Sequence, residues 1–257
     1  MGEIIAITSQ KGGVGKTTTS INLGASLAIF QKRVLLIDID PQGSIAASFQ
    51  LDDLSIAYGT YDVFVKRIPL SLAIIDVGLD MLEIVPANVR GEEDEIDLFT
   101  NALQTELLRS VLSSYKNEYD YILLDCPPSL GTVTLNAITA ADSLLIPVQC
   151  EYYSLKALGK FIRAIRNIGT KYNPELRLNG LLITMLDKRL KKSNEIVDEL
   201  RHSFKDLVFN TEIPRNSRIS EAPSLGKPVA LVDISSPGAI SYLKLAEEII
   251  EKENNRF

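Results

Sequence analysis

Short runs of hydrophobic residues recur along the chain and alternate with segments whose apolar residues have helical spacing. The runs are continuously apolar, which is typical of strands buried on both faces of a parallel sheet. We expect strands at Ile4–Thr8, Val34–Asp38, Met81–Pro86, Tyr121–Asp125, Ser143–Val148 and Gly180–Met185. We expect helices after the first strand and at Asn101–Tyr115, Thr132–Ala140, Ser154–Thr170, Ser193–Phe204 and Gly238–Glu251.

Strands that alternate with helices predict an α/β fold, a three-layer sandwich in which helices flank a mostly parallel, twisted central sheet. The 257 residues are 46% hydrophobic, enough for one large core, and we find neither a repeat nor a linker. We therefore expect a single domain over residues 1–257. The chain has no run of eighteen apolar residues and no leader-like start, so we expect a soluble, cytoplasmic protein.

The segment Ser9–Thr18, SQKGGVGKTT, lies between the first expected strand and a helical segment. A strand, a glycine-rich loop and a helix N-terminus in this order bind a polyphosphate. Glycines let backbone N–H groups turn toward phosphate oxygens, Lys16 neutralises the β/γ charge, and the Thr17 hydroxyl can ligate Mg²⁺. The residues expected to contact the nucleotide are Lys11, Gly12, Gly13, Val14, Gly15, Lys16, Thr17 and Thr18.

The beginning of this loop departs from the standard phosphate-loop pattern. That pattern has a glycine five residues before Gly15, where this chain has Gln10, and an additional lysine, Lys11, follows. Lys11 comes too early to cap the phosphates that Lys16 holds. Spacing alone leaves two interpretations open: Lys11 is a solvated surface charge, or it reaches the nucleotide of a second subunit docked face to face.

Acidic residues follow two expected strands, at the carboxyl edge where an α/β sheet binds its ligands. Asp38 and Asp40 are spaced to point the same way, and Asp125 follows four apolar residues. An acid in this position is the usual Mg²⁺ partner in phosphate-loop enzymes, so we place Asp125 on the metal side. A lone aspartate often only caps a turn or helix. Three of them in a chain with the loop favour the metal site.

Hydrolysis also requires a water in line with the γ-phosphate and compensation of the charge that develops there. Asp40 is placed for the first task, and Lys11, supplied by a second subunit, for the second. The single histidine, His202, lies far from these motifs, and we expect it to be an exposed surface residue. Cys126 and Cys150 are too few for a metal cage, so we expect structural burial, with a cluster bridging two subunits as the alternative.

Charge is distributed unevenly along a chain whose formal net charge is −6. Acids concentrate in residues 92–97, which we interpret as a solvated loop or a helix start. Bases concentrate later, at Lys188, Arg189, Lys191, Lys192, Arg201, Lys205, Arg215, Arg218 and Lys227. Without further information, a solvated helix start is the favoured interpretation of the bases near Lys188.

Taken together, these motifs resemble the ParA/Soj partition ATPases, a branch of the deviant Walker-A, MinD-like phosphate-loop family. The likeness runs nearly from end to end of the chain. It is carried by residues 11–18, by residues 38–43 (DIDPQG), by residues 125–131 (DCPPSLG) and by residues 213–224 (IPRNSRISEAPS). The last of these blocks distinguishes this branch from its relatives.

The resemblance implies a role for individual residues. Lys11 resembles the signature lysine that contacts the neighbouring subunit's nucleotide, and Gly12 the glycine that permits close dimer approach. Asp40 resembles the water-activating acid. The other implied assignments are the phosphates and Mg²⁺ for Lys16 and Thr17, the metal shell for Asp38 and Asp125, the adenine border for Pro214 and Asn216, and DNA contacts for Arg189 and Arg218.

The resemblance also implies cofactors and partners. Members of this family bind ATP and Mg²⁺, form a sandwich homodimer around the nucleotide and hydrolyse it slowly. The dimers bind double-stranded DNA without sequence preference, and a ParB-type partner stimulates hydrolysis, which implies a cytoplasmic, nucleoid-associated protein that moves a chromosome or plasmid. Contacts with DNA phosphates are driven by charge, so an acidic monomer with only a few basic residues should bind DNA poorly. Pairing two subunits would strengthen DNA binding.

Three other classes of protein share parts of this pattern. A MinD-type membrane-associated positioning ATPase should end in a basic amphipathic helix, whereas residues 245–257 are rich in acids that anionic lipid would repel, so we expect no membrane partner. A reductase of the nitrogenase iron protein type requires cluster cysteines, and nothing pairs Cys126 convincingly with Cys150. A pure scaffold would bind nucleotide without turnover.

Overall fold

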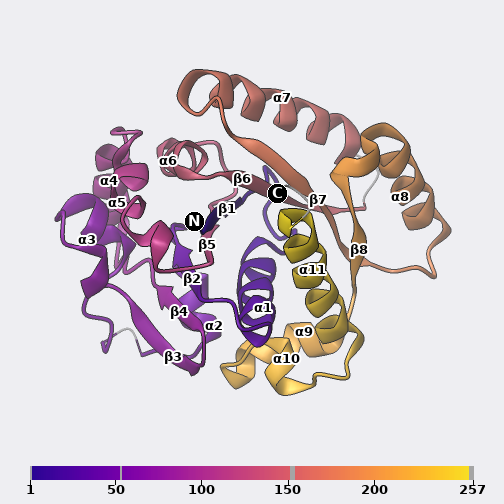
Figure 1. Ribbon diagram of the computed structural model, residues 1–257, viewed down its shortest axis with the longest axis horizontal. Coiled ribbons are helices and arrows are strands. Elements are labelled where there is room, and N and C mark those ends of the chain that lie inside the picture. Colours follow the sequence, from indigo (N-terminus) through magenta and orange to yellow (C-terminus); the bar gives the residue numbers. More distant parts are fainter. Residues whose placement is uncertain (1, 53, 151–153, 255–257) are drawn as a thin grey trace.

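The computed structural model of the protein describes residues 2–52, 54–150 and 154–254 (Figure 1). One sheet of eight strands has the order β3-β4-β2-β5-β1-β6-β7-β8. The strands are β1 (Glu3–Ile7), β2 (Val34–Asp38), β3 (Ile75–Leu79), β4 (Leu82–Val85), β5 (Tyr121–Asp125), β6 (Ser143–Gln149), β7 (Arg177–Leu186) and β8 (Val208–Pro214). All pairings are parallel except that of β3 with β4.

Helices cover both faces of the sheet, as Figure 1 shows. One layer contains α3 (Thr60–Val65), α4 (Glu92–Asn101), α5 (Leu107–Leu112), α6 (Thr132–Ala140), α7 (Ser154–Tyr172) and α8 (Lys191–Phe204). The opposite layer contains α1 (Lys16–Ile29), α2 (Ser44–Ser48), α9 (Ser217–Glu221), α10 (Val229–Val232) and α11 (Pro237–Asn254). Short 3-10 helices lie at Leu70–Leu72, Tyr115–Asn117, Lys205–Leu207 and Ala222–Leu225. The predicted three-layer α/β sandwich is confirmed.

Alternate side chains of the central strands divide the core in two. Ile4 and Ala6 of β1 belong to the cluster under α6 and α7, whereas Ile5 and Ile7 belong to the cluster under α1 and α11. All four are buried, since both faces of the strand are covered. This double coverage is why the strands read as continuous apolar runs.

The register of the central strands brings the strand-end acids together. Ile7 at the end of β1 pairs with Asp125 at the end of β5, and Asp125 pairs with Asp38 at the end of β2. The phosphate loop follows β1 directly, so it lies beside both carboxylates at the carboxyl edge of the sheet. The predicted convergence of these motifs on one edge is confirmed.

Two strands and the position of one helix were not predicted correctly. β3 is an antiparallel strand at the edge of the sheet, and its residues are exposed or partly buried. β8 pairs irregularly with β7 at the other edge. Neither strand has the continuous apolar run on which the prediction relied. The helix expected at 101–115 is shorter than predicted, because only α5 (Leu107–Leu112) lies within that range, and the additional helix α4 begins at Glu92. Four acids in the first turn of α4 interact favourably with the positive end of the helix dipole. Within the described residues, no helix is long and apolar enough to cross a membrane.

Candidate active site

The glycine loop has the open geometry that a phosphate cradle requires. Gly13 and Gly15 have φ of 71° and 90°, a region that favours glycine, and Gly15 precedes the first residue of α1. A Cβ added at Gly12 or Gly13 would meet no heavy atom within 4 Å. The Thr184 hydroxyl on β7 donates a 2.8 Å hydrogen bond to the carbonyl of Val14 and holds the loop from below. The loop is therefore fixed on its inner side and open on its outer side.

Lys16 and Thr17 occupy the first positions of α1, at the positive end of the helix dipole. Lys16 is only 7% exposed. The charge of its ammonium lowers the pKa of the nearby Asp125 carboxyl, so the two buried groups interact. At the N-terminus of α1 the ammonium is also placed to attract an anion held by the loop. This is the arrangement expected of a lysine that holds phosphate.

Thr17, Ser20 and Asp125 form a buried hydroxyl and carboxylate group. The Thr17 hydroxyl donates to Asp125 Oδ2 at 2.6 Å, and the Ser20 hydroxyl donates to Asp125 Oδ1 at 2.8 Å. Burial raises the pKa of Asp125 to about 6, although the two hydroxyls oppose the shift. The Asp125 carboxylate thus lies in hydrogen-bond contact with the hydroxyl that we predict to ligate Mg²⁺.

Asp38 has two hydrogen bonds that the sequence did not indicate. Its carboxylate accepts from the amide of Asp40 at 3.1 Å and from the amide of Ile45 at 3.0 Å. Both oxygens therefore shape the turn that leads from β2 to α2. Burial and the neighbouring charge of Asp125 raise the pKa of Asp38 well above its ordinary value. Asp38 fixes the position of Asp40, and its place in the metal shell stays a prediction.

Asp40 lies in that turn and is 8% exposed. Its Oδ1 accepts from the amide of Gln42 at 3.1 Å, and its carbonyl accepts from Gly43 at 3.0 Å. The Thr60 hydroxyl on α3 donates to the carbonyl of Asp38 at 2.7 Å, which ties the turn to the adjacent helix. Asp40 is thus held in a rigid turn at the same sheet edge as the loop, where a water-aligning carboxylate is needed.

The charges of the site fit a nucleotide with a divalent cation. Two buried carboxylates whose pKa values are raised, Asp38 and Asp125, lie in the same site as the buried Lys16, whose charge partly opposes the shift at Asp125. Within the described part of the chain, no group of three or more His, Cys, Asp or Glu side chains is placed to hold a metal. A cation here would take ligands from Thr17, from phosphate oxygens and from water, with the carboxylates behind them, as Mg²⁺ accepts.

Lys11 lies on the exposed side of the loop. Its ammonium donates to Gln149 Oε1 at 3.3 Å, at the end of β6. A cavity of about 570 Å³ borders this part of the loop, lined in part by Gln10, Val14 and Phe161. The structure places Lys11 away from Lys16 and toward solvent, which is compatible with both interpretations of the sequence.

Pro214 and Asn216 lie at the same sheet edge as the loop. Pro214 ends β8, and the following amide, Arg215, donates to the carbonyl of Leu186 at 3.0 Å. Asn216 caps α9 by accepting from the amide of Arg218 at 3.1 Å. A parallel sheet brings these residues to the loop side, and their contact with adenine stays a prediction.

Arg189 and Arg218 are both engaged in ion pairs. Arg189 binds Asp187 through two nitrogens, at 2.9 and 2.7 Å, and lowers the pKa of Asp187 to about 2. Arg218 contacts Glu221 at 2.9 Å and Asp233 at 3.7 Å. Both arginines are exposed, so they can reach a polyanion. To bind it, each would have to break its ion pair or contact the acid and the polyanion together.

The remaining candidates agree with expectation in position. His202 is exposed on α8, and Cys126 is fully buried, which raises its thiol pKa well above the ordinary value. Cys150 is partly buried, and its pKa is raised to about 11. Sequence reasoning missed Ser20 and Thr184, whose hydroxyls orient Asp125 and the loop. Ser20 lies one turn after Lys16 on α1, and that spacing was the only available signal.

Comparison with known proteins indicates the family of this chain. The family model described as an AAA domain matches residues 2–178. The sporulation initiation inhibitor protein Soj of Bacillus subtilis is 46% identical over 97% of this chain and 98% of its own length. The chromosome partitioning protein ParA of Myxococcus xanthus is 44% identical over 98% of this chain and 89% of its own length.

Solved structures give the same result for the fold. A structure described as cobyrinic acid a,c-diamide synthase from Mycobacterium smegmatis, with a bound ATP analogue and magnesium, superposes with a TM-score of 0.84 at 30% identity, covering 100% of this chain and 98% of that chain. The cell division ATPase MinD of Pyrococcus furiosus superposes with a TM-score of 0.83 at 25% identity, covering 98% and 99%. By its sequence, this chain belongs to the Soj/ParA family of chromosome-partitioning ATPases within the AAA-domain phosphate-loop proteins.

Proposed function

We propose that ATP and Mg²⁺ at the phosphate loop join two copies of this partition ATPase face to face. The dimer binds double-stranded DNA without sequence preference, and hydrolysis, triggered by a ParB-type partner, releases it. Repeated cycles on nucleoid DNA in the cytoplasm would move a chromosome or plasmid region. Residues 1–257 act as a single domain in this proposal, which the one continuous sheet supports.

The observation that carries the proposal is the loop with its inner side fixed and its outer side open. Lys16 and Asp125 are buried and Thr17 is partly buried in hydrogen-bond contact with Asp125, whereas Lys11 and Gly12 are exposed. Because a Cβ at Gly12 would meet no atom of its own chain, the surface above it is open to a second molecule. This arrangement supports a nucleotide held by one copy and covered by another.

The residues divide the reaction between binding, orientation and charge compensation. When bound, Mg²⁺ would neutralise the phosphates, with Thr17, Asp125 and Asp38 around it. Lys16 holds the β/γ-phosphates, Asp40 orients the attacking water, and the partner copy's Lys11 compensates the charge that develops. Pro214 and Asn216 border the adenine.

Dimerisation would switch DNA binding through charge. Arg189 and Arg218 are each paired with acids in a chain whose net charge is −6, so these two arginines of one copy offer few phosphate contacts. Two copies on one duplex double the contacts, an avidity gain of roughly 10² or more where the geometry allows. ATP would thereby control DNA affinity without touching DNA.

Co-sedimentation with DNA tests the proposal. The protein is spun with plasmid DNA in the presence of ATP, ADP or no nucleotide, each across a salt series. We expect sedimentation only with ATP, weakening steeply as salt rises. Equal binding in all three nucleotide states would contradict the proposed switch.

The alternative is a MinD-type cycle of membrane binding and release, and the structural similarity to MinD of Pyrococcus furiosus is the observation that favours it. The observation against it is α11, whose second half carries Glu247, Glu248, Glu251 and Glu253. A helix with these acids would be repelled by anionic lipid. Binding to anionic vesicles that exceeds binding to DNA would favour the alternative.

A further inference from the structure

Helix α7 carries an unusual charge pattern for a chain with a net charge of −6. Its 19 residues contain five cations and no acid. At 100° per residue the five lie on one arc of roughly 140°, and the large apolar residues lie on the opposite arc. We call this arc the α7 basic face, and it consists of Lys156, Lys160, Arg163, Arg166 and Lys171.

The α7 basic face points to solvent. All five cations are exposed, whereas Leu158, Phe161 and Ile165 are buried against the sheet, and Arg166, at the edge of the arc, also borders a cavity beneath the helix. In Figure 1, α7 runs along the outside of the molecule above β6 and β7. The positions between the cations are small or neutral, such as Gly159 and Ala164, so no bulky group keeps a flat partner away.

These cations differ from the arginines near 189 and 218 in what they contact. In the described ranges none of the five forms an ion pair, and Lys171 only lies 4.7 Å from the ring centroid of Tyr172. Arg189 and Arg218 each bind an acid at 2.9 Å or closer. A polyanion can therefore reach the α7 basic face without breaking any ion pair. Binding a polyanion at the α7 basic face therefore costs fewer ion pairs than binding it at Arg189 and Arg218.

The spacing of the cations suits a repeated phosphate. From Lys156 to Lys171 the helix rises about 22 Å at 1.5 Å per residue, the length of roughly six base-pair steps of a duplex. Cations that recur every three or four residues on one rigid helix can contact successive phosphates along that length. A lysine or arginine in contact with phosphate releases a counter-ion and makes binding salt-dependent.

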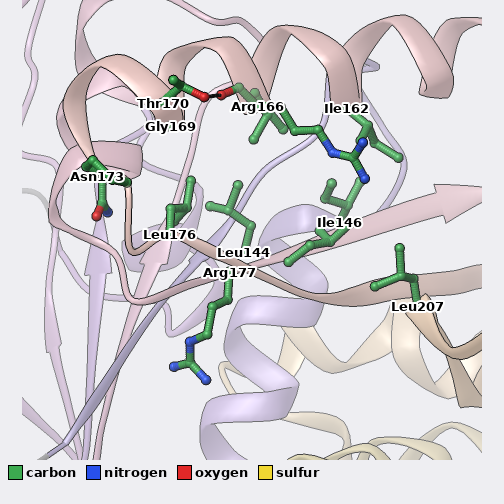
Figure 2. Close-up of a pocket in the computed structure, with 13 residues that line it drawn as sticks. Leu144, Ile146, Ile162, Arg166, Gly169, Thr170, Asn173, Leu176, Arg177 and Leu207 are labelled. Atoms are coloured by element: carbon green, nitrogen blue, oxygen red, sulfur yellow. Dashed lines mark hydrogen bonds between the residues drawn. The ribbon is translucent and has the colours of Figure 1, made fainter.

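The underside of α7 argues against a lipid partner. A membrane-surface helix inserts its apolar face, but that face of α7 is packed on β6 and β7. A cavity of about 700 Å³ remains beneath its second half, with Ile162 and Arg166 along the helix and Leu144 below, as Figure 2 shows. Arg166 borders this cavity, and the apolar side chains that line it are not on the surface that carries Lys156, Lys160, Arg163 and Lys171.

We propose that the α7 basic face is a second surface of this protein that binds the phosphate backbone of duplex DNA. The inference rests on the proposed DNA-binding function and adds a contact surface that the arginines near 189 and 218 do not provide. The first turns of α7 also line the cavity beside the phosphate loop, through Ala157 and Leu158. The surface is therefore adjacent to the nucleotide site that would control it.

The test neutralises two central cations in the double variant Lys160→Gln/Arg163→Gln. Glutamine keeps the helix propensity, and neither residue belongs to the nucleotide site. The matched control is Arg33→Gln/Lys244→Gln, which makes the same charge change at exposed sites off α7. Binding of ATP-loaded protein to a fluorescent duplex of arbitrary sequence is measured by anisotropy over a salt series, with ATP binding and dimer mass recorded for each variant.

We expect the α7 variant to bind DNA at least about tenfold more weakly, with the slope of log K against log salt reduced by roughly 2 per subunit bound. ATP binding and dimer mass should stay unchanged, and the control should match the wild type. Wild-type affinity and slope in the α7 variant would overturn this inference and leave the proposed function intact. Failure of the wild type to bind DNA with ATP would overturn both. Binding to anionic vesicles that the α7 variant loses, with DNA binding unchanged, would assign the face to lipid and overturn the inference.

Discussion

The Thr17 hydroxyl on α1 donates a 2.6 Å hydrogen bond to Asp125 Oδ2 at the end of β5. The two residues are 108 positions apart, and the parallel pairing of β1 with β5 brings them together. The bond links the helix that follows the phosphate loop to the acid on the metal side. Because Asp125 is fully buried, its charge has to be compensated from within the site.

Replacement of the loop lysine should abolish nucleotide binding. In Lys16→Ala the one buried cation at the N-terminus of α1 is lost, so phosphate charge is no longer compensated. We expect no measurable binding of a fluorescent ATP analogue in a titration, with Lys32→Ala as the control that binds normally. Wild-type affinity in Lys16→Ala would contradict the role of Lys16.

Replacement of the water-orienting acid should separate binding from turnover. Asp40→Ala keeps the buried Thr17 and Asp125 group, so ATP should still bind and the dimer should stay on DNA. Hydrolysis should fall by 10² or more, because general-base assistance and water alignment are lost. Phosphate release under saturating ATP measures this, and fast hydrolysis in Asp40→Ala would refute the role given to that acid.

Stability should depend on pH through the buried carboxylates. Burial raises the pKa of Asp125 to about 6, so the folded state keeps its proton where the unfolded state has lost it. The nucleotide-free protein should therefore lose stability as pH rises from about 4 to about 6, by on the order of 3 kcal/mol, and then level off. The raised pKa of Asp38 acts in the same direction.

Urea unfolding of the wild type and of Asp125→Asn over this pH range measures the effect. The variant lacks the titrating group, so its stability relative to the wild type should increase between pH 4 and pH 7. A constant difference over the whole range would show that Asp125 titrates normally in the folded protein.

Charge reversal at Arg218 should remove DNA binding and spare dimerisation. Arg218 contacts Glu221 and Asp233, so Arg218→Glu leaves three acids together and repels phosphate. ATP-dependent dimer mass should be normal, because the residue contributes nothing to the phosphate loop. Undiminished DNA binding would take Arg218 off the contact surface.

A packing prediction concerns Gly180 on β7. A Cβ there would lie 2.5 Å from the ring of Phe209, so Gly180→Ala should destabilise the protein by about 1–3 kcal/mol through overpacking. Gly159 on α7 has its nearest atom at 3.8 Å, and Gly159→Ala should instead stabilise the helix by up to about 1 kcal/mol. Thermal unfolding gives the change in unfolding temperature of each variant relative to the wild type. We expect a decrease for Gly180→Ala and an increase for Gly159→Ala, and equal changes would contradict the packing.

Periodicity predicted the parts of the molecule that are buried on both sides. β2, β5 and α6 have the predicted bounds, because continuous apolar runs and a clear helical stretch leave little choice of register. β3 and β8 were missed because an edge strand that is half exposed has no such run. The acids of residues 92–97 were interpreted as a solvated loop or a helix start, and α4 shows that they form a helix start.

In the site, sequence spacing indicated the candidate residues but not their hydrogen-bond and ion-pair partners. Asp38 was expected beside the metal, but its contacts with the amides of Asp40 and Ile45 depend on a turn that no motif describes. The ion pair of Arg189 with Asp187 was visible as two charges two residues apart and was not interpreted. The cations of α7 are three to five residues apart in the sequence and come together only on the helix, whereas the basic residues near 188 are almost contiguous.

Light scattering tests the central claim most directly. The mass of the protein is measured with ATP and Mg²⁺ and again with ADP and Mg²⁺, and bound nucleotide is quantified in both samples. We predict twice the chain mass of 28.3 kDa with ATP and the single-chain mass with ADP. A mass of 28.3 kDa in a sample that demonstrably retains ATP would contradict the account.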